Sequence, residues 1–339
     1  MNRASPLAGL FSRKNIPIGA RLPKLKNPRL EPDWKQADPS WIDRALACSQ
    51  KRSSGGWWVA DVSSEVGQVP RSHRIDGQEV VLWRSRDGVH AAPAACPHMG
   101  ADLSCASVHN GKLRCPWHGL ELGPQGHGTW RPYPCHDDGV LVWIRLAPAE
   151  QPTDAPIQAE RPKHGIEAVI RMEAQCEPLD IVANRLDPWH GVHYHPHSFA
   201  DLNVLEQSKD EVVLRVAYRA FGPFCVEVDA RFHSPERNSI VMTIVAGEGK
   251  GSIVSTHATP IDEGRTMVTE VTFATSERMG FRIAEYAGGL LEPFIKRRAR
   301  LLWIDDIAYA ERRYQLRTGK KRASASNRAE TTSPTTDGL

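Results

Sequence analysis

Four residues with metal-binding side chains form two short motifs in the first half of the chain. Cys96 and His98 are separated by one residue, and Cys115 and His118, sixteen residues further on, are separated by two. Zinc fingers usually present both cysteines first and both histidines later. The alternating order instead fits a two-iron cluster in which one iron takes two cysteines and the other takes two histidines.

A second group of metal-binding side chains follows in the stretch NRLDPWHGVHYHPHSF, residues 184–199. It contains Asn184, Asp187, His190 and His195. Two histidines and one carboxylate, with coordination positions left open, are typical of non-haem Fe(II) oxygenases. On an ideal helix His190 and His195 would point about 140° apart. Because Pro196 disfavours the α conformation at His195, we expect the helix that begins near Pro188 to end there.

CPHMG followed by CPWHG resembles the Rieske signature of ring-hydroxylating and related oxygenases. Respiratory Rieske proteins carry two further cysteines that form a disulfide in these loops, and here the positions hold Ala101 and Trp117. The resemblance therefore points to the oxygenase or ferredoxin branch. A structural zinc site in an interaction module is the alternative for these four residues.

The resemblance also implies roles for the second group. His190 and His195 would ligate a mononuclear iron, and Asp187 would connect the iron histidine to the Rieske histidine of a neighbouring subunit. Asn184 would lie beside the iron. The third ligand would come from a late helix, where Asp305 and Asp306 are both candidates; we choose Asp306 because Glu311 follows it five residues later, as in vanillate-demethylase-like members. A solvated, charged helix face is the competing interpretation of this Asp pair.

The elements that must position these residues divide the chain into two parts. Short β-type runs with Asx-Gly turns predict an antiparallel β domain over residues 55–148. A Pro-rich linker follows at 149–164, and residues 165–318 combine strand patterns with long C-terminal helices broken at Gly288-Gly289 and Pro293. The expected fold is α+β: a Rieske [2Fe–2S] domain and a helix-grip-like catalytic domain. Residues 1–54 form a basic arm and lead-in, and 319–339 a disordered tail.

Composition narrows the functional classes. The net charge of +3 gives no reason to expect nucleic-acid binding. Seven cysteines without a leader sequence favour reduced thiols and a cytoplasmic location. Residues 1–30 contain seven basic and no acidic residues, so they are either a solvated arm or a contact for an anionic membrane surface or an acidic redox partner.

The resemblance implies a terminal oxygenase component with a [2Fe–2S] cluster and a mononuclear Fe(II). Electrons would come from NAD(P)H through a flavin reductase, a ferredoxin or both, and the subunits would form a head-to-tail homotrimer. With O2, the enzyme would hydroxylate or oxidatively demethylate a hydrophobic small molecule: a terpenoid or carotenoid, a steroid or an aromatic compound. The alternative is a Rieske electron-transfer protein without oxygenase chemistry.

Overall fold

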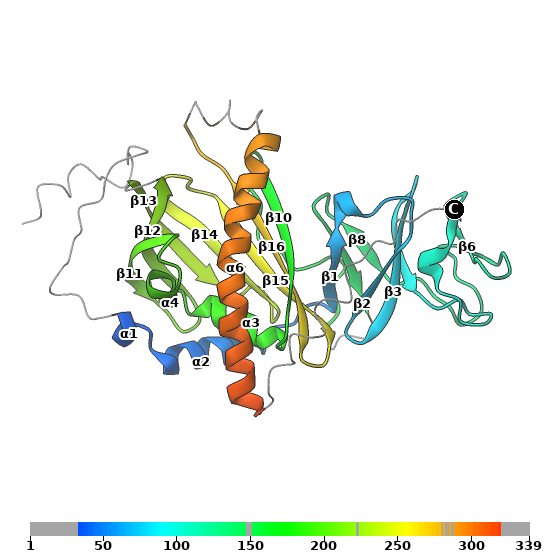
Figure 1. Ribbon diagram of the computed structural model, residues 1–339, viewed down its shortest axis with the longest axis horizontal. Helices are drawn as coiled ribbons and strands as arrows, with labels where there is room; N and C mark the ends of the chain where they lie inside the picture. The colour runs from blue at the N-terminus through cyan, green and yellow to red at the C-terminus, as the bar shows by residue number, and fades with distance from the viewer. Residues whose placement is uncertain are drawn as a thin grey trace, which may run out of the picture.

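The computed structural model describes residues 33–146, 151–221, 224–278, 281, 285 and 288–319. Two β-rich parts lie next to each other along the long axis of the molecule (Figure 1). The basic segment 1–30 and all of the expected tail except residue 319 lie outside the described residues. Within the described part of the chain, no helix is both long enough and apolar enough to cross a membrane.

The N-terminal part consists of three small antiparallel sheets, as the short strand patterns predict. Their strand orders are β1-β9-β8, β2-β3-β4 and β5-β6-β7. The strands are β1 (Trp57–Val62), β2 (Arg71–Ile75), β3 (Gln78–Ser85), β4 (Gly88–Pro93), β5 (Ser107–His109), β6 (Lys112–Arg114), β7 (Glu121–Leu122), β8 (Cys135–Asp137) and β9 (Leu141–Arg145). Two 3-10 turns, η1 (Ser63–Glu65) and η2 (Leu103–Cys105), complete this part.

Two of the hairpins turn on Asx-Gly pairs whose backbone is left-handed at both positions. Asp76 and Gly77 have φ angles of 49° and 72°, and Asn110 and Gly111 have 50° and 78°. Positive φ at both central residues matches the twist of the flanking strands, and Asn, Asp and Gly tolerate it best. The Asn110-Gly111 turn joins β5 to β6, and β6 leads directly into Cys115.

The C-terminal part is one seven-stranded antiparallel sheet of order β10-β16-β15-β14-β13-β12-β11. Its strands are β10 (Ile166–Ala174), β11 (Phe199–Gln207), β12 (Val212–Phe221), β13 (Phe224–His233), β14 (Ser239–Gly247), β15 (Ile253–Asp262) and β16 (Arg265–Ala274). These strands account for the strand patterns expected within residues 165–318. The predicted α+β class, with an antiparallel sheet in each part, is confirmed.

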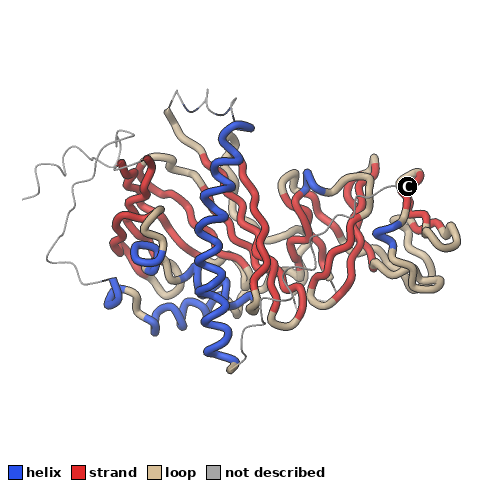
Figure 2. Tube along the Cα trace, viewed as in Figure 1, coloured by secondary structure: helices blue, strands red, loops and turns tan. Residues whose placement is uncertain are grey.

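The long helix α6 (Gly288–Thr318) lies across one face of this sheet (Figures 1 and 2). The expected break at Pro293 is wrong, because the helix continues through it. Pro293 is only the sixth residue of the helix, so its ring removes a hydrogen bond close to the N-terminal end, where helices are least dependent on one.

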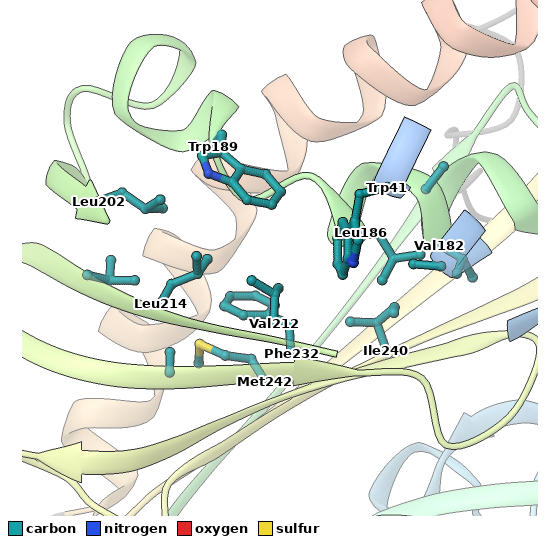
Figure 3. Packing of buried hydrophobic residues seen from close by; sticks show 14 of the residues in the cluster. Trp41, Val182, Leu186, Trp189, Leu202, Val212, Leu214, Phe232, Ile240 and Met242 are labelled. Atoms are coloured by element: carbon teal, nitrogen blue, oxygen red, sulfur yellow. The ribbon is translucent and has the colours of Figure 1, made fainter. Parts of the chain in front are cut away.

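Shorter helices pack against the sheet and α6 and enclose the main core. They are α1 (Asp33–Gln36), α2 (Pro39–Ser49), α3 (Pro178–Leu186) and α4 (His190–Tyr194). Trp41 of α2 meets Trp189 edge to face with ring centroids 5.9 Å apart, and both pack among buried residues of α3 and the sheet (Figure 3). The lead-in to the first domain therefore packs against the second one.

The two parts are docked through β1 and β2 on one side and β10 and β15 on the other. Thr259 donates a hydrogen bond to the Val59 carbonyl at 3.0 Å. Arg171 forms an ion pair with Asp61, which is nearly inaccessible to solvent. Burial would raise the pKa of Asp61, but His73 and Arg171 outweigh this and lower it to about 2.

A buried carboxylate joins α3 to α6, the helices that carry most of the candidate iron-site residues. Asp180 has no exposed side-chain surface and accepts hydrogen bonds from Arg313 at 2.6 Å and from Arg317 at 2.8 Å. Both arginines belong to the last turns of α6. This contact therefore fixes the position of α3 along α6.

We expect Asp180→Asn to lower the free energy of unfolding. Removing one partner of a buried ion pair costs roughly 3–5 kcal/mol, and because the two arginines are 25% and 34% exposed we expect a smaller loss of about 2 kcal/mol. Urea denaturation followed by tryptophan fluorescence measures it. Glu177→Gln is the control, since this exposed residue binds the same Arg317 and should cost less than about 1 kcal/mol. Equal losses for the two variants would contradict the role of the buried contact.

Candidate metal centres and active site

The two Cys/His loops of the N-terminal part have the same backbone hydrogen bonds. The N–H of Gly100 donates to the Cys96 carbonyl at 2.8 Å, and the N–H of Gly119 donates to the Cys115 carbonyl at 3.0 Å. Both glycines have left-handed φ angles, 79° and 73°. In each loop the cysteine N–H also donates to the residue five positions later, Ala101 or Leu120. The matched geometry confirms the expected pair of tight loops.

The four predicted cluster ligands lie together at the tips of these loops. The rings of His98 and His118 are 4.8 Å apart, centroid to centroid, and are exposed, whereas Cys96 and Cys115 are buried. Burial would raise the pKa of the Cys115 thiol, but the backbone N–H of residue 117, the Cys96 thiol and the backbone N–H of residue 118 outweigh it and lower this pKa, whereas burial and the neighbouring Cys115 raise the pKa of Cys96. Such N–H groups stabilise a thiolate, which is the form that binds iron.

The loops bring one cysteine and one histidine each to the site, with the two histidine rings side by side. This pairing fits the two-iron cluster expected from the alternating order, in which one iron takes two cysteines and the other two histidines.

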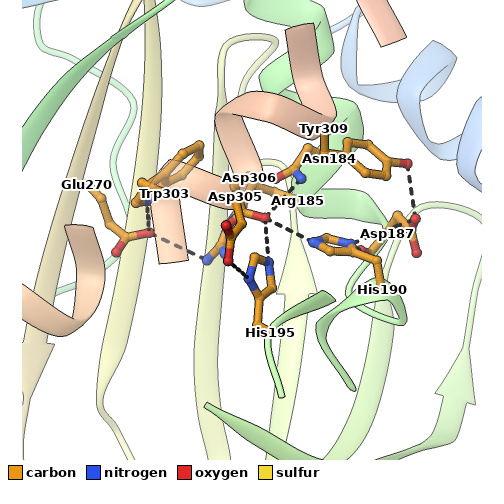
Figure 4. A network of polar contacts seen from close by, with 10 residues as sticks. All are labelled: Asn184, Arg185, Asp187, His190, His195, Glu270, Trp303, Asp305, Asp306 and Tyr309. Atoms are coloured by element: carbon orange, nitrogen blue, oxygen red, sulfur yellow. Dashed lines mark hydrogen bonds and ion pairs between the residues drawn. The ribbon is translucent and has the colours of Figure 1, made fainter. Parts of the chain in front are cut away.

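In the C-terminal part, two imidazoles and a carboxylate converge at the surface of α6. The Nε2 atoms of His190 and His195 lie 2.9 and 3.0 Å from the same oxygen, Oδ1 of Asp306 (Figure 4). Asp306 and His195 are buried, and the side chain of His190 is 15% exposed. Burial would raise the pKa of Asp306, but the two histidines outweigh this and hold it well below its usual value.

The other ring nitrogens show why this arrangement suits a cation. The Nδ1 of His190 lies against the backbone carbonyl of Asp187, and the Nδ1 of His195 is 3.2 Å from the Asp305 carboxylate. A proton on each Nδ1 satisfies these contacts and leaves Nε2 of each ring as the atom that faces Asp306. Without a cation, a proton on Nε2 is needed for that ring to stabilise the ionised carboxylate. A divalent iron would take the place of such protons, so the donor set fits the expected metal.

The local backbone explains how residues five apart in sequence face one site. Helix α4 ends at Tyr194. The backbone of His195 is no longer helical, with φ −120° and ψ 54°, as expected from Pro196. The predicted start of this helix is corrected: α4 begins at His190 rather than at Pro188. Asp187 instead follows the last residue of α3, where its N–H donates to the Asn184 carbonyl.

The structure distinguishes between the two adjacent aspartates of α6. Asp306 faces the imidazole Nε2 atoms and is 2% exposed. Asp305 contacts the opposite nitrogen of His195 and its side chain is 36% exposed. With His195 and His197 it forms a second possible ligand group, but His197 is exposed. The geometry therefore favours Asp306, and His193, which is also exposed, belongs to neither group.

Asn184 and Asp187 lie on either side of the three converging residues. The Nδ2 of Asn184 donates to Oδ1 of Asp306 at 3.0 Å, and the Asn184 Oδ1 is buried without a partner. Asp187 accepts a hydrogen bond at 3.0 Å from Tyr309, whose ring stacks on His190 with centroids 5.0 Å apart. The Oδ1 of Asp187 is also buried without a partner. Glu311 is remote from this group and accepts from the Gln175 N–H.

A cavity of about 400 Å³ opens beside the converging residues. Aliphatic and aromatic side chains make up most of its wall, from Phe199, Leu202, Val216, Phe232, Met242, Ile244, Val254, Ile295 and Leu302.

Sequence reasoning missed three polar residues of this site. Tyr309 follows Asp306 by three positions, a spacing that places both on one helix face and could have identified it. Glu270 lies in the middle of β16, and a charged residue between buried strand neighbours is a signal of a special role. Burial raises the pKa of Glu270, although Arg185 and Trp303 oppose this. Arg185 had no signal in the sequence.

Two protein-family matches meet between residues 144 and 147, at the boundary between the two parts of the chain. Residues 56–144 match the Rieske [2Fe-2S] domain. Residues 147–321, about half of the chain, match a family described as a domain of unknown function, DUF5914.

Curated relatives match over limited regions. The oxygenase subunit of vanillate O-demethylase from Pseudomonas sp. is 41% identical over 71 residues, which are 21% of this chain and 20% of that protein. The oxygenase component of dicamba O-demethylase from Stenotrophomonas maltophilia is 35% identical over 103 residues, 26% of this chain and 30% of that protein. The matches thus span a third or less of these relatives.

Solved structures match over most of the chain. Dicamba monooxygenase bound to dicamba superposes with a TM-score of 0.57 and 21% identity, covering 80% of this chain and 92% of that one. The oxygenase in a reduced complex with ferredoxin, from carbazole 1,9a-dioxygenase, gives a TM-score of 0.56 at 13% identity, covering 84% and 88%. With the convergent residues described above, these findings show that the chain belongs to the DUF5914 family, that it carries a Rieske [2Fe–2S] domain, and that it has the fold of the Rieske oxygenases.

Proposed function

We propose that this protein is the oxygenase component of a Rieske non-haem iron system. The observation that carries the proposal is the convergence of His190, His195 and Asp306 in a chain that also contains the paired Cys/His loops. An electron-transfer protein would need the loops alone. When bound, the cluster and the iron supply electron transfer and dioxygen activation, which protein side chains cannot perform.

We assign the cluster to Cys96, His98, Cys115 and His118, and the mononuclear iron to His190, His195 and Asp306. Asn184 orients the carboxylate of Asp306 by donating to its Oδ1. The carbonyl of Asp187 holds the Nδ1 proton of His190, which keeps Nε2 of that ring as the ligand atom. The sequence-based domain limits, 55–148 and 165–318, are retained as part of this proposal.

The placement of the two centres suggests that electrons pass between subunits. The β5–β7 sheet, from which the cluster loops extend, lies at the end of the molecule remote from the seven-stranded sheet (Figure 1). Met99 and Trp117, beside the cluster histidines, are 63% and 60% exposed. Exposed apolar side chains of this kind mark protein contacts. They support a head-to-tail trimer in which Asp187, with its unpartnered buried oxygen, faces the neighbouring cluster.

We propose a hydrophobic small molecule as the substrate and hydroxylation or oxidative demethylation as the reaction. The largely apolar cavity next to the iron ligands supports this. Two relatives are named as O-demethylases, and one similar structure is an oxygenase in complex with a ferredoxin. We therefore propose a ferredoxin or a flavin reductase as the electron donor. We also propose a reducing, cytoplasmic location, because the five cysteines other than Cys96 and Cys115 form no disulfide.

Iron content tests the two-centre assignment. The purified protein should contain about three iron atoms per chain and show the EPR signal of a histidine-ligated [2Fe–2S] cluster. His190→Ala and Asp306→Asn should each lose about one iron atom and keep the cluster signal, because they remove ligands of the mononuclear site only. Asp305→Asn is the matched control and should keep all of the iron. About two iron atoms in the wild type would favour the electron-transfer protein, and none would exclude both functions.

Asp187→Ala should leave both centres loaded and slow electron transfer between them. We expect reoxidation of the reduced cluster by O2 to slow at least ~10-fold, because residues that orient metal ligands typically contribute this much. The reoxidation rate is measured from the visible absorption of the cluster. Tyr309→Phe removes only one hydrogen bond from Asp187 and should slow it less. Unchanged reoxidation in Asp187→Ala would show that the bridging role is wrong.

A further inference from the structure

Apart from the iron-site residues, the interior wall of the cavity carries two charged side chains of the described chain, Arg185 and Glu270. Arg298 also borders the cavity, but it donates to the Arg219 carbonyl at an exposed position. Arg185 and Glu270 are largely buried, with side chains 16% and 7% exposed. Charged groups in an apolar cavity are costly unless they are paired or bind a ligand.

The guanidinium of Arg185 is held in place but incompletely hydrogen-bonded. Its Nη2 is 3.7 Å from Oε2 of Glu270, which is beyond hydrogen-bond distance, and its Nε is buried without a partner. The guanidinium lies over the ring of Trp303 at 5.7 Å. Figure 4 shows Arg185 between this Trp303–Glu270 pair and Asp306. The Nη groups also have no hydrogen-bond partner among the described residues and, unlike Nε, they are not buried, so they are the donors that the cavity can reach.

Unlike the Arg185 guanidinium, the carboxylate oxygen Oε2 of Glu270 already has hydrogen-bond partners in the protein. The indole N–H of Trp303 donates to it at 2.8 Å and the hydroxyl of Thr256 at 3.4 Å. These contacts anchor the carboxylate in the protein. Burial raises the pKa of this carboxyl, whereas Arg185 and the Trp303 N–H oppose the rise, and in its ionised form Glu270 balances the charge of Arg185.

Tyr218 supplies a second weakly satisfied donor to the same cavity. Its hydroxyl donates to the thioether sulfur of Met242 at 3.2 Å. Sulfur of this type is a weak acceptor, so a ligand oxygen would be a better partner. Burial raises the pKa of Tyr218 to about 12, which keeps the hydroxyl protonated and able to donate at neutral pH.

We propose that Arg185 and Tyr218 bind a neutral oxygen acceptor, a ketone or hydroxyl oxygen, on an otherwise hydrophobic substrate. This inference rests on the proposed oxygenase function, because it concerns the orientation of a substrate beside the iron site. Two donors and a balanced charge favour an uncharged acceptor over a carboxylate, and the apolar wall takes the rest of the molecule. Such a site discriminates against analogues that lack the oxygen, because its buried donors would stay unpaired.

Binding of four matched probes tests the proposal: methyl naphthyl ketone, naphthylethanol, ethylnaphthalene and naphthoate, all substituted at the same ring position. Dissociation constants are measured by calorimetry on the iron-loaded protein with its cluster oxidised, so that no turnover occurs. The ketone or the alcohol should bind roughly tenfold to hundredfold more tightly than ethylnaphthalene, the range expected for a hydrogen bond from a charged donor. Comparing the ketone with the alcohol identifies the preferred oxygen.

Variants locate the preference. Tyr218→Phe should reduce the preference for the ketone or alcohol over ethylnaphthalene, and Arg185→Met should largely abolish this preference. The double variant Arg185→Met/Glu270→Gln avoids leaving a carboxylate buried alone. Arg185→Lys keeps the positive charge but not the Nε donor, so it should retain the preference only in part. Val254→Ala, a cavity residue without a donor, should change the affinity for all four probes alike.

Three results would overturn the inference: neither the ketone nor the alcohol binds more tightly than ethylnaphthalene, including the case in which none of them binds; naphthoate binds most tightly; or the preference survives in both Tyr218→Phe and Arg185→Met. Iron content is measured on every sample. Loss of the mononuclear iron in the wild type would instead contradict the proposed function, so the two failures can be distinguished.

Discussion

One carboxylate oxygen organises the candidate active site. Oδ1 of Asp306 lies within 3.0 Å of two imidazole nitrogens and one amide nitrogen, from His190, His195 and Asn184. Its position requires α6 to meet both α3 and the short helix α4. Convergence of so many nitrogen atoms on one buried oxygen is stable only if charge is shared among them, by protons or by a cation. The rest of the C-terminal part can be understood as the support for this contact.

The support is provided by packing on one side and by polar contacts on the other. Trp41 and Trp189 close the core beneath α3, and Asp180 ties α3 to the end of α6. The tryptophan pair belongs to the same core cluster as Leu202, Phe232 and Met242, which line the cavity. The cavity can therefore remain largely empty of protein atoms without loss of a fixed geometry at its edge, because the surrounding core is close-packed. This arrangement leaves room for a substrate of moderate size beside three rigidly held side chains.

The two parts of the chain divide the chemistry. The N-terminal loops hold buried cysteines and exposed histidines, so one side of the cluster site faces outward, where an electron partner can approach. The C-terminal part encloses the proposed metal ligands and leaves Arg185 and Tyr218 with unfilled or weakly filled hydrogen bonds. Exposure thus suits electron transfer in one part, and enclosure suits substrate recognition in the other.

The sequence alone determined the residues that depend on local geometry. The spacing of Cys96, His98, Cys115 and His118 predicted the paired loops, and Pro196 predicted the end of the helix at His195, because tight turns and prolines act over a few residues. The sequence favoured Asp306 over Asp305 only through its spacing to Glu311, and the tertiary structure shows that Asp306 is the one that faces the two imidazole Nε2 atoms. It also brought Arg185, Tyr218 and Glu270, from three separate elements, to one cavity. Such contacts depend on how a helix is rotated against a sheet, which is set by packing across the whole core rather than by any short pattern.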